Sequence, residues 1–435
     1  MITQLNIHYT KKIIKLLFKK TSLFFTEKSF SVKKRLVFLF VFVSSISFSQ
    51  ILIKGNILSE TNKPLVGASV YFNNTTIGTI TNSKGEFELK IKEGNYTLII
   101  SFLGYKTKQL LITPQNNDVN IHIKLKEDSS ILNEIVIKKT VYDDNWKHNL
   151  ARFKHAFLGR TKLAETCKIL NEKDIHFNYN IKKNTLTAFT KKPLKIKHQG
   201  LGYIITYDLV DFTLKNQNLF FSGFARYDNL RKNIKRKWKQ NRLKAFNGSQ
   251  MHFLRSLTSK KLKKDGFLVN QFKRVPNPDR PSEEKINFAR EYFNLCNKPI
   301  NLSKNISNPK TTLDSVIVTL QKAKLPKYQD FLYKRDVAYK DMISYDNKTP
   351  YLSFKDYLMV IYTLEPEEEN YLIGMFGKRK KPSGVQTSNI VLLEGKAQID
   401  KSGVLINPNA IFNEGYWGFE AFANMLPLDY KPSSN

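Results

Sequence analysis

Cysteine is scarce in this sequence of 435 residues, which contains only Cys167 and Cys296. A cysteine-based zinc site needs several thiolate or imidazole ligands at short spacing, and no such cluster occurs. We therefore expect no metal ion and no cofactor. In an oxidising compartment the two cysteines are candidates for a disulfide, and two separate buried thiols are the alternative.

Catalytic motifs are also missing. The sequence has no H-E-x-x-H, no G-x-S-x-G and no G-x-x-x-x-G-K-[ST] pattern, which mark zinc peptidases, serine hydrolases and phosphate-binding loops. We therefore expect a protein that is not an enzyme. The alternative is an envelope hydrolase of glycan or peptide with an unrecognised site in residues 145–435. Its acid and base would come from scattered carboxylates, such as Glu165, Asp174, Asp208 and Asp211.

Acidic residues are few, with 37 Asp and Glu against 71 Lys and Arg, which leaves a net charge of +34. The excess peaks in residues 229–264, which contain 13 basic residues and no acidic residue. A positively charged surface attracts anionic partners. We therefore expect the partner to be an anionic glycan, an anionic lipid or an unknown envelope protein, and we expect no nucleic acid. A solvated helix face in a lysine-rich proteome is the alternative explanation. The candidate surface consists of Lys235, Arg236, Lys237, Lys239, Arg242, Lys260, Lys261, Lys263 and Lys264.

A short apolar run near the N-terminus predicts export. Basic residues 33–35 precede the apolar residues 36–48, and small residues follow, which is the pattern of a secretory signal with cleavage between Ser49 and Gln50. The run is shorter than the roughly 20 residues of a transmembrane helix. We expect a periplasmic or outer-membrane-associated protein whose mature chain has no transmembrane span. An uncleaved anchor is the alternative, and residues 1–32 are either a long basic leader or precede the true start.

Residues 51–125 alternate between apolar and polar side chains in short stretches separated by turns. Phe87, Leu89 and Ile91, for example, alternate with charged residues. Such strands at regular spacing predict an antiparallel β-sandwich. In the turn at residues 82–85, we expect Gly85 to adopt a positive φ.

These residues resemble the carboxypeptidase-regulatory-like domain. The resemblance covers residues from about 50 to 125 and rests on Gly55, KPLVGASV at 63–70, GTITNSKGEF at 78–87, GNYTL at 94–98 and GY at 104–105. It implies a seven-stranded Greek-key sandwich of the transthyretin-like fold. Asn82 stands where the family usually has Asp. In metallocarboxypeptidases this domain accompanies a separate zinc peptidase domain, whose motif is missing, so the resemblance is to the accessory domain without the enzyme.

Residues 129–137 follow this domain and read SSILNEIVI. They resemble the short segment that follows the same domain in TonB-dependent outer-membrane receptors. We interpret them as a shared domain-plus-tail arrangement, and a last strand with a linker is the alternative.

The rest of the chain predicts an α+β region with antiparallel sheet and several helices. We expect helices at 144–158, within 229–264, at 283–293 and at 416–425, and strands that include 186–197, 201–213, 219–227 and 313–320. The predicted organisation is an N-terminal extension and signal peptide at 1–49, the β-sandwich at 50–126, a linker at 127–144, an α+β region with basic helices at 145–275 and a C-terminal α+β region at 282–435. Together these features predict an exported cell-envelope protein with a non-catalytic β-sandwich module and a binding or structural role.

The export prediction has a direct test. Fractionation of cells followed by N-terminal sequencing is expected to find the protein in the envelope fraction, beginning at Gln50. A cytosolic protein that retains residues 1–49 would contradict the prediction.

Overall fold

The structure, a computed structural model, describes residues 50–92, 94–113, 119–128, 141–216, 218–296, 301–347, 349–373, 379–400 and 403–432. The described residues from Ile51 onward belong to one compact unit. The predicted signal, including Ser49, and the predicted tail at 129–137 lie outside the described residues. Among the helices that are described, none is both long and apolar enough to cross a membrane.

The N-terminal β region has seven strands in two sheets, as the sequence predicted. The sheet orders are β4-β1-β7 and β3-β2-β5-β6. Their bounds are β1 Gln50–Ser59, β2 Ser69–Phe72, β3 Gly78–Ile80, β4 Glu86–Lys92, β5 Tyr96–Ser101, β6 Lys108–Ile112 and β7 Val119–Leu125. Alternate side chains such as Phe87, Leu89 and Ile91 point into a shared apolar core, because successive residues of a strand face opposite sides of its sheet.

One pairing in this region differs from the antiparallel sandwich that we expected. Strands β1 and β7 are the first and last of the region, and they pair in parallel, with Ile53 opposite Val119 and Ile57 opposite Ile123. Alternation predicts that a strand has one buried face, but it carries no information on strand direction. The expectation of a purely antiparallel arrangement was therefore wrong.

The turn before β4 confirms the role expected of its glycine. Gly85 has φ +74°, and a Cβ there would lie 2.6 Å from the carbonyl oxygen of Ile57. Asn82 closes the same turn, since its Oδ1 accepts hydrogen bonds from the backbone N–H groups of Lys84 and Glu86, both at 2.9 Å. The uncharged side chain therefore performs the turn-closing role that Asx residues usually have.

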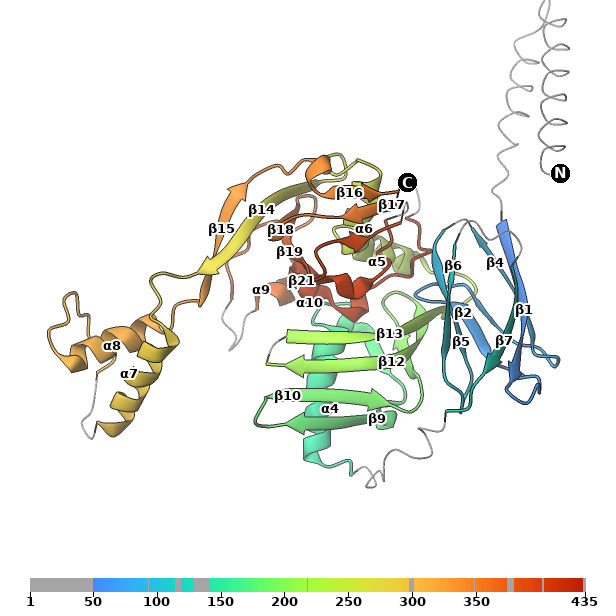
Figure 1. The fold of residues 1–435 in the computed structure, drawn as a ribbon, viewed down its shortest axis with the longest axis horizontal. Coiled ribbons are helices and arrows are strands. Elements are labelled where there is room, and N and C mark those ends of the chain that lie inside the picture. The colour runs from blue at the N-terminus through green and yellow to red at the C-terminus, as the bar shows by residue number, and fades with distance from the viewer. Residues whose placement is uncertain are drawn as a thin grey trace, which may run out of the picture. The chain divides into compact units, whose positions relative to one another are not determined.

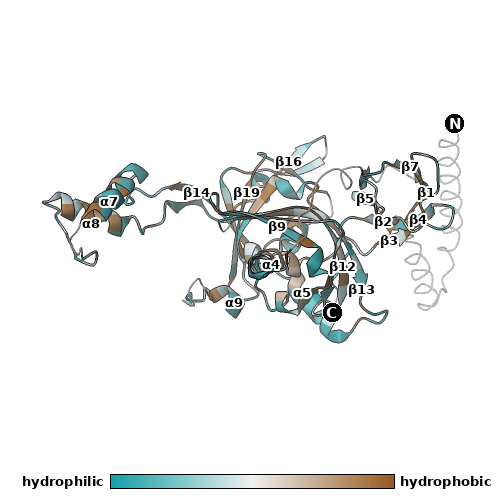
Figure 2. Ribbon diagram, turned by 90° about the horizontal axis from the view of Figure 1, so that it is seen from below, coloured by the Kyte–Doolittle hydropathy of each residue, from teal (hydrophilic) through white to brown (hydrophobic). Residues whose placement is uncertain are grey.

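A six-stranded antiparallel sheet follows, covered on one face by helix α4, Asp144–Leu158 (Figures 1 and 2). Its strands are β8 Cys167–Ile169, β9 Ile175–Asn180, β10 Thr185–Thr190, β11 Leu194–His198, β12 Tyr203–Lys215 and β13 Asn218–Asn229. The buried Phe153 and Phe157 of α4 pack on this sheet, with ring centroids of Phe153 and Phe212 4.6 Å apart. The helix has the predicted bounds, because its apolar residues recur every three to four positions.

The predicted strand at 186–197 is two strands, β10 and β11. Pro193 lies between them, and proline has no N–H to donate to a strand ladder. The alternation continues through this break, which is why the sequence suggested a single strand. β12 and β13 confirm the predicted hairpin and pair with each other along almost their full length.

The remaining residues form a second sheet with the order β15-β14-β18-β19-β21 and a small sheet with the order β16-β17-β20. The strands are β14 Phe267–Pro276, β15 Tyr328–Lys334, β16 Ile343–Asp346, β17 Thr349–Leu352, β18 Tyr357–Tyr362, β19 Gln386–Leu392, β20 Ala397–Gln398 and β21 Ile411–Gly415. The helices are α5 Arg236–Phe246, α6 Gln250–Thr258, α7 Glu283–Leu295, α8 Thr312–Lys322, α9 Glu369–Leu372 and α10 Tyr416–Glu420. Because β14 pairs with β15 and β18, residues 267–276 belong to the second sheet. The domain boundaries themselves stay predictions.

The strand predicted at 313–320 is wrong, because these residues form helix α8. Thr311 and Asp314 make a capping box at the start of α8, which satisfies backbone N–H groups that a helix leaves free. Val316 and Ile317 are buried, and α8 packs against α7. Their β-branched side chains suggested a strand, but tertiary packing overrides this weak preference.

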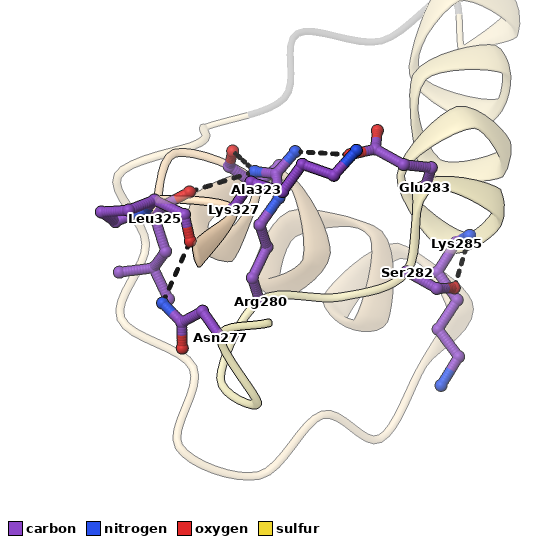
Figure 3. A network of polar contacts seen from close by, with 9 residues as sticks. Asn277, Arg280, Ser282, Glu283, Lys285, Ala323, Leu325 and Lys327 are labelled. Carbon is purple, nitrogen blue, oxygen red and sulfur yellow. Dashed lines mark hydrogen bonds and ion pairs between the residues drawn. The ribbon is translucent and has the colours of Figure 1, made fainter. Parts of the chain in front are cut away.

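Arg280 joins the two ends of the α7–α8 hairpin (Figure 3). Its Nη1 donates to the carbonyl oxygens of Ala323 and of Leu325, the latter at 3.1 Å, and its Nη2 bonds Glu283 at 3.1 Å. The guanidinium therefore satisfies carbonyls at the C-terminal end of α8 and also contacts the first turn of α7. Asn277 adds a bond from its side chain to the carbonyl oxygen of Pro326, at 3.1 Å.

Replacing Arg280 with alanine is expected to loosen this hairpin, because two backbone carbonyls lose a charged donor worth about 1–3 kcal/mol each. Hydrogen exchange followed by mass spectrometry should show faster exchange across residues 283–322 and unchanged exchange in β12 and β13. Arg290→Ala removes an exposed arginine of α7 and serves as the control. Equal exchange profiles for the two variants would contradict the role assigned to Arg280.

Candidate functional site

Helix α5 carries the first group of predicted basic residues. Four of its residues recur at spacings of one to four along one face and are buried: Trp238, Arg242, Ala245 and Phe246. The basic residues at its start are exposed: Lys235, Arg236, Lys237 and Lys239. One side of α5 therefore packs on the core, and the other side presents positive charge to solvent.

The start of α5 is fixed on the chain segment that leads into β12. The indole Nε1 of Trp238 donates to the carbonyl oxygen of Gln199 at 2.9 Å. Gly202 lies directly beneath the indole, with φ +74°, and a Cβ there would be 2.2 Å from Trp238 Cδ2. Any larger residue at position 202 would displace the helix, so this contact sets where the basic face lies.

Arg242 differs from the other predicted surface residues because it is buried, with 6% of its surface exposed. Its Nε donates to the carbonyl oxygen of Leu201 and its Nη2 to Asn229 Oδ1, both at 2.9 Å. The guanidinium carbon lies 3.8 Å from the ring centroid of Tyr203. The prediction that Arg242 is part of an open surface was therefore wrong. The charge of a helix residue says nothing of which way it points, and the position falls on the buried side of α5.

A cavity of about 300 Å³ lies next to α5. It brings two of the predicted residues, Lys239 and Arg242, together with residues that the sequence analysis did not single out. Its lining is Thr76, Tyr203, Asn229, Ile234, Lys239, Arg242, Pro427, Asp429, Tyr430 and Lys431. The cavity is formed by parts of the chain that are distant in sequence: residue 76, the end of β13 and the segment 427–431. No local sequence motif predicts that they lie close together.

The second predicted basic group follows helix α6 and has different neighbours. Its four lysines are exposed: Lys260, Lys261, Lys263 and Lys264. Lys263 forms an ion pair with Asp336 at 3.2 Å, and the Lys260 ammonium lies 5.1 Å from the ring centroid of Tyr339. Of the nine predicted residues, Lys263 is the one with an ion pair within the described part of the chain. The other exposed cations are uncompensated there.

The four carboxylates considered for a hydrolase have separate partners. Glu165 accepts from Asn370 at 3.0 Å, Asp174 from Asn171 at 2.9 Å, Asp208 from Thr107 at 3.5 Å and Asp211 from Thr213 at 3.4 Å. None of the four lines the cavity beside α5. Within the described ranges, no three His, Cys, Asp or Glu residues are arranged to hold a metal ion.

Cys167 and Cys296 are both free thiols. The Cys167 Sγ lies 3.7 Å from the carbonyl oxygen of Leu163, and burial raises the pKa of this thiol to about 12. A thiol with so high a pKa is a poor nucleophile at neutral pH. Cys296 is half-buried directly after helix α7.

A buried carboxyl group that the sequence analysis missed lies at Glu420, which is 8% exposed. Asn424 Nδ2 donates to its Oε1 at 3.3 Å, and Thr161 in turn donates to Asn424 Oδ1 at 2.7 Å. Burial raises the pKa of Glu420 to about 8; the Asn424 bond opposes this rise, and Glu368 and Glu365 nearby add to it. The sequence feature that could have indicated this burial is the aromatic run Tyr416, Trp417 and Phe419 directly before Glu420. These aromatic side chains are buried, and Glu420 follows them on the same short helix.

Comparison with known proteins assigns the N-terminal β region. Residues 53–137 match the family described as CarboxypepD_reg-like domain, so the resemblance found from the sequence is confirmed, and the match extends through the predicted tail. The remaining α+β region is not part of that match.

Two TonB-dependent receptors are similar to part of this chain. The chain is 38% identical over 98 residues to the TonB-dependent receptor SusC of Bacteroides thetaiotaomicron, which is 22% of this chain and 9% of that protein. It is 28% identical over 85 residues to the TonB-dependent receptor P39 of Formosa agariphila, 20% of this chain and 8% of that one. The CarboxypepD_reg-like domain is therefore of the kind found in SusC-type receptors, and the chain spans less than a tenth of the length of either relative.

Among solved structures, a DUF3823 family protein from Bacteroides ovatus aligns with 42% of this chain and 83% of its own chain. The sequence identity is 9% and the TM-score is 0.16. A similarity at this level supports no conclusion about the α+β region.

The high pKa of Glu420 predicts a pH-dependent stability. Below a pH of about 4.5 the carboxyl is protonated in both the folded and the unfolded protein, so its contribution to the free energy of unfolding does not change with pH. Between that pH and about 8 the unfolded chain loses the proton that the folded chain keeps, so stability falls as the pH rises, by about 1.4 kcal/mol per unit at most. Glu420→Gln removes this dependence, and its stability advantage over the natural protein is expected to grow across this range.

Urea unfolding of both proteins at several pH values measures this difference. Glu284→Gln, which changes an exposed glutamate, is the control and should leave the pH profile unchanged. Parallel profiles for the natural protein and Glu420→Gln would show that Glu420 ionises normally.

Proposed function

We propose that this chain is an exported, non-catalytic protein of the cell envelope that binds an anionic partner through the exposed basic face of α5. The N-terminal domain is a transthyretin-like Greek-key sandwich with a docking or stabilising role. The partner-binding function belongs to residues 145–435.

Envelope location is supported by the kind of N-terminal domain and by the predicted signal peptide. The same kind of domain is found in SusC-type TonB-dependent receptors, and the apolar run at 36–48 has the features of an export signal. A non-catalytic role is supported by the missing motifs and by the separate contacts of the four candidate carboxylates.

The observation that carries the binding proposal is the uncompensated charge at the start of α5. Four consecutive or nearly consecutive cations, Lys235, Arg236, Lys237 and Lys239, are exposed, and none of them has an ion pair within the described residues. A single exposed ion pair contributes only about 0–1 kcal/mol, so tight binding to this surface requires several such pairs at once. A cluster of such charges attracts a polyanion, and salt weakens the attraction.

Binding to an acidic polysaccharide tests this proposal. The exported protein should bind polyglucuronate, bind the neutral polymer dextran much more weakly, and lose affinity steeply as salt is added. The triple variant Lys235→Gln, Arg236→Gln, Lys237→Gln is expected to bind about tenfold more weakly, because each exposed charge contributes about 0.5 kcal/mol.

A matched variant separates this surface from net charge. Lys182→Gln, Lys183→Gln, Lys192→Gln also removes three exposed lysines, but it leaves α5 intact and should retain most of the affinity. An equal loss in both triple variants would indicate non-specific attraction, and no binding to polyglucuronate would exclude the proposed partner class for this surface.

A further inference from the structure

The cavity beside α5 has the composition of a binding site for a small anion. It contains three cations, Lys239, Arg242 and Lys431, and one carboxylate, Asp429. Asp429 is already engaged, since its Oδ1 accepts from the backbone N–H of Thr76 at 2.9 Å and its Oδ2 from the Thr76 hydroxyl. The formal charge of the lining is therefore positive at neutral pH.

Arg242 gives this cavity a prearranged donor. Its Nε and Nη2 are bound to Leu201, Gly202 and Asn229, which fixes the plane of the guanidinium. Within the part of the chain that the structure describes, its Nη1 has no hydrogen-bond partner. The residue as a whole is 6% exposed, but this amine group is not among the buried atoms that lack a partner, so it is open to the cavity that Arg242 lines. A guanidinium held in a fixed plane with a free N–H pair favours a charged acceptor.

The other polar groups of the cavity suit a ligand with hydroxyl groups. Burial raises the pKa of Tyr203 to about 12 and also raises that of Tyr430, against the opposing effect of Arg242. Both phenols therefore stay neutral near pH 7 and can donate or accept hydrogen bonds. The side chains of Asn229 and Thr76 add further polar groups to the lining.

We propose that this cavity binds the carboxylate of one acidic sugar residue, with Arg242 Nη1 as the fixed donor and Lys239 and Lys431 at its sides. The proposal rests on the proposed function, because it names the group of the anionic partner that is recognised. A cavity near 300 Å³ is at the small end of ligand pockets, so it takes a single sugar unit, whereas the open face of α5 attracts the polymer around it. A sugar is favoured over a lipid because, among the described residues, Ile234 and Pro427 are the only aliphatic side chains in the lining. A dianionic phosphate would meet more repulsion from Asp429 than a carboxylate does.

Calorimetry with the exported protein and a glucuronic acid disaccharide tests the cavity, with a neutral glucose disaccharide and inorganic phosphate as comparison probes. Lys239→Gln and Lys431→Gln are each expected to weaken binding of the acidic disaccharide about fivefold. Arg242→Lys keeps the positive charge but loses the planar guanidinium with its fixed N–H donors. It should weaken binding of the acidic disaccharide at least as much as either lysine variant. Because Arg242 also bonds backbone carbonyls, that variant counts only where its unfolding midpoint matches the natural protein.

Lys244→Gln is the matched control, since it removes an exposed lysine from the same helix that belongs neither to the basic face nor to the cavity lining, and it should change disaccharide affinity little. Equal losses for Lys244→Gln and Lys239→Gln would overturn the cavity proposal and leave the surface proposal standing. Tighter binding of phosphate than of the acidic disaccharide would also overturn it. If neither polyglucuronate nor the disaccharide binds, the proposed function itself fails.

Discussion

The burial of the segment 416–430 is the constraint on which the arrangement of residues 51–430 depends. Phe422 stacks on Phe157 of α4, with ring centroids 4.5 Å apart. Trp417 Nε1 donates to the carbonyl oxygen of Gly248 at 2.7 Å, which connects the segment to the turn between α5 and α6. At its far end, the backbone N–H of Leu428 donates to the carbonyl oxygen of Asn74 in the N-terminal β region, at 2.6 Å. One segment thus contacts helix α4, the turn between α5 and α6, and the N-terminal β region.

Two polar side chains hold this segment in place, the buried His198 and the half-buried Arg255. His198 Nδ1 accepts from the backbone N–H of Leu201, so its Nε2 carries the proton that is donated to the carbonyl oxygen of Ala423 at 2.8 Å. Burial lowers the pKa of His198 to about 4, which keeps the ring neutral in this tautomer. Arg255 donates to the carbonyl oxygens of Leu428 and Tyr430, each at 2.8 Å. The cavity beside α5 exists because these bonds hold Asp429, Tyr430 and Lys431 against it.

Local patterns predicted the elements that depend on local contacts. The strands of the β region follow from alternation, and their core lies within residues 51–125. Helix α4 follows from three- and four-residue spacing, although it packs on residues as distant as Phe422. The sequence predicted a strand at helix α8 because Val316, Ile317 and Val318 are β-branched. Packing against α7 stabilises the helix instead, and this contact is not visible in the local sequence. The site was predicted in part: the basic residues of α5 were identified, but the burial of Arg242 and the approach of residues 427–431 depend on contacts between distant parts of the sequence.

The position of the segment 416–430 along the chain also orders the events of folding. The β region has a core of its own within residues 51–125. It can therefore fold as soon as these residues have been synthesised. The core around Phe153 and Phe157 includes Phe422, Ala423 and Leu426, so it stays incomplete until those residues have been synthesised. A polypeptide that crosses a membrane N-terminus first would therefore keep its larger core open during transit and close it only on the far side.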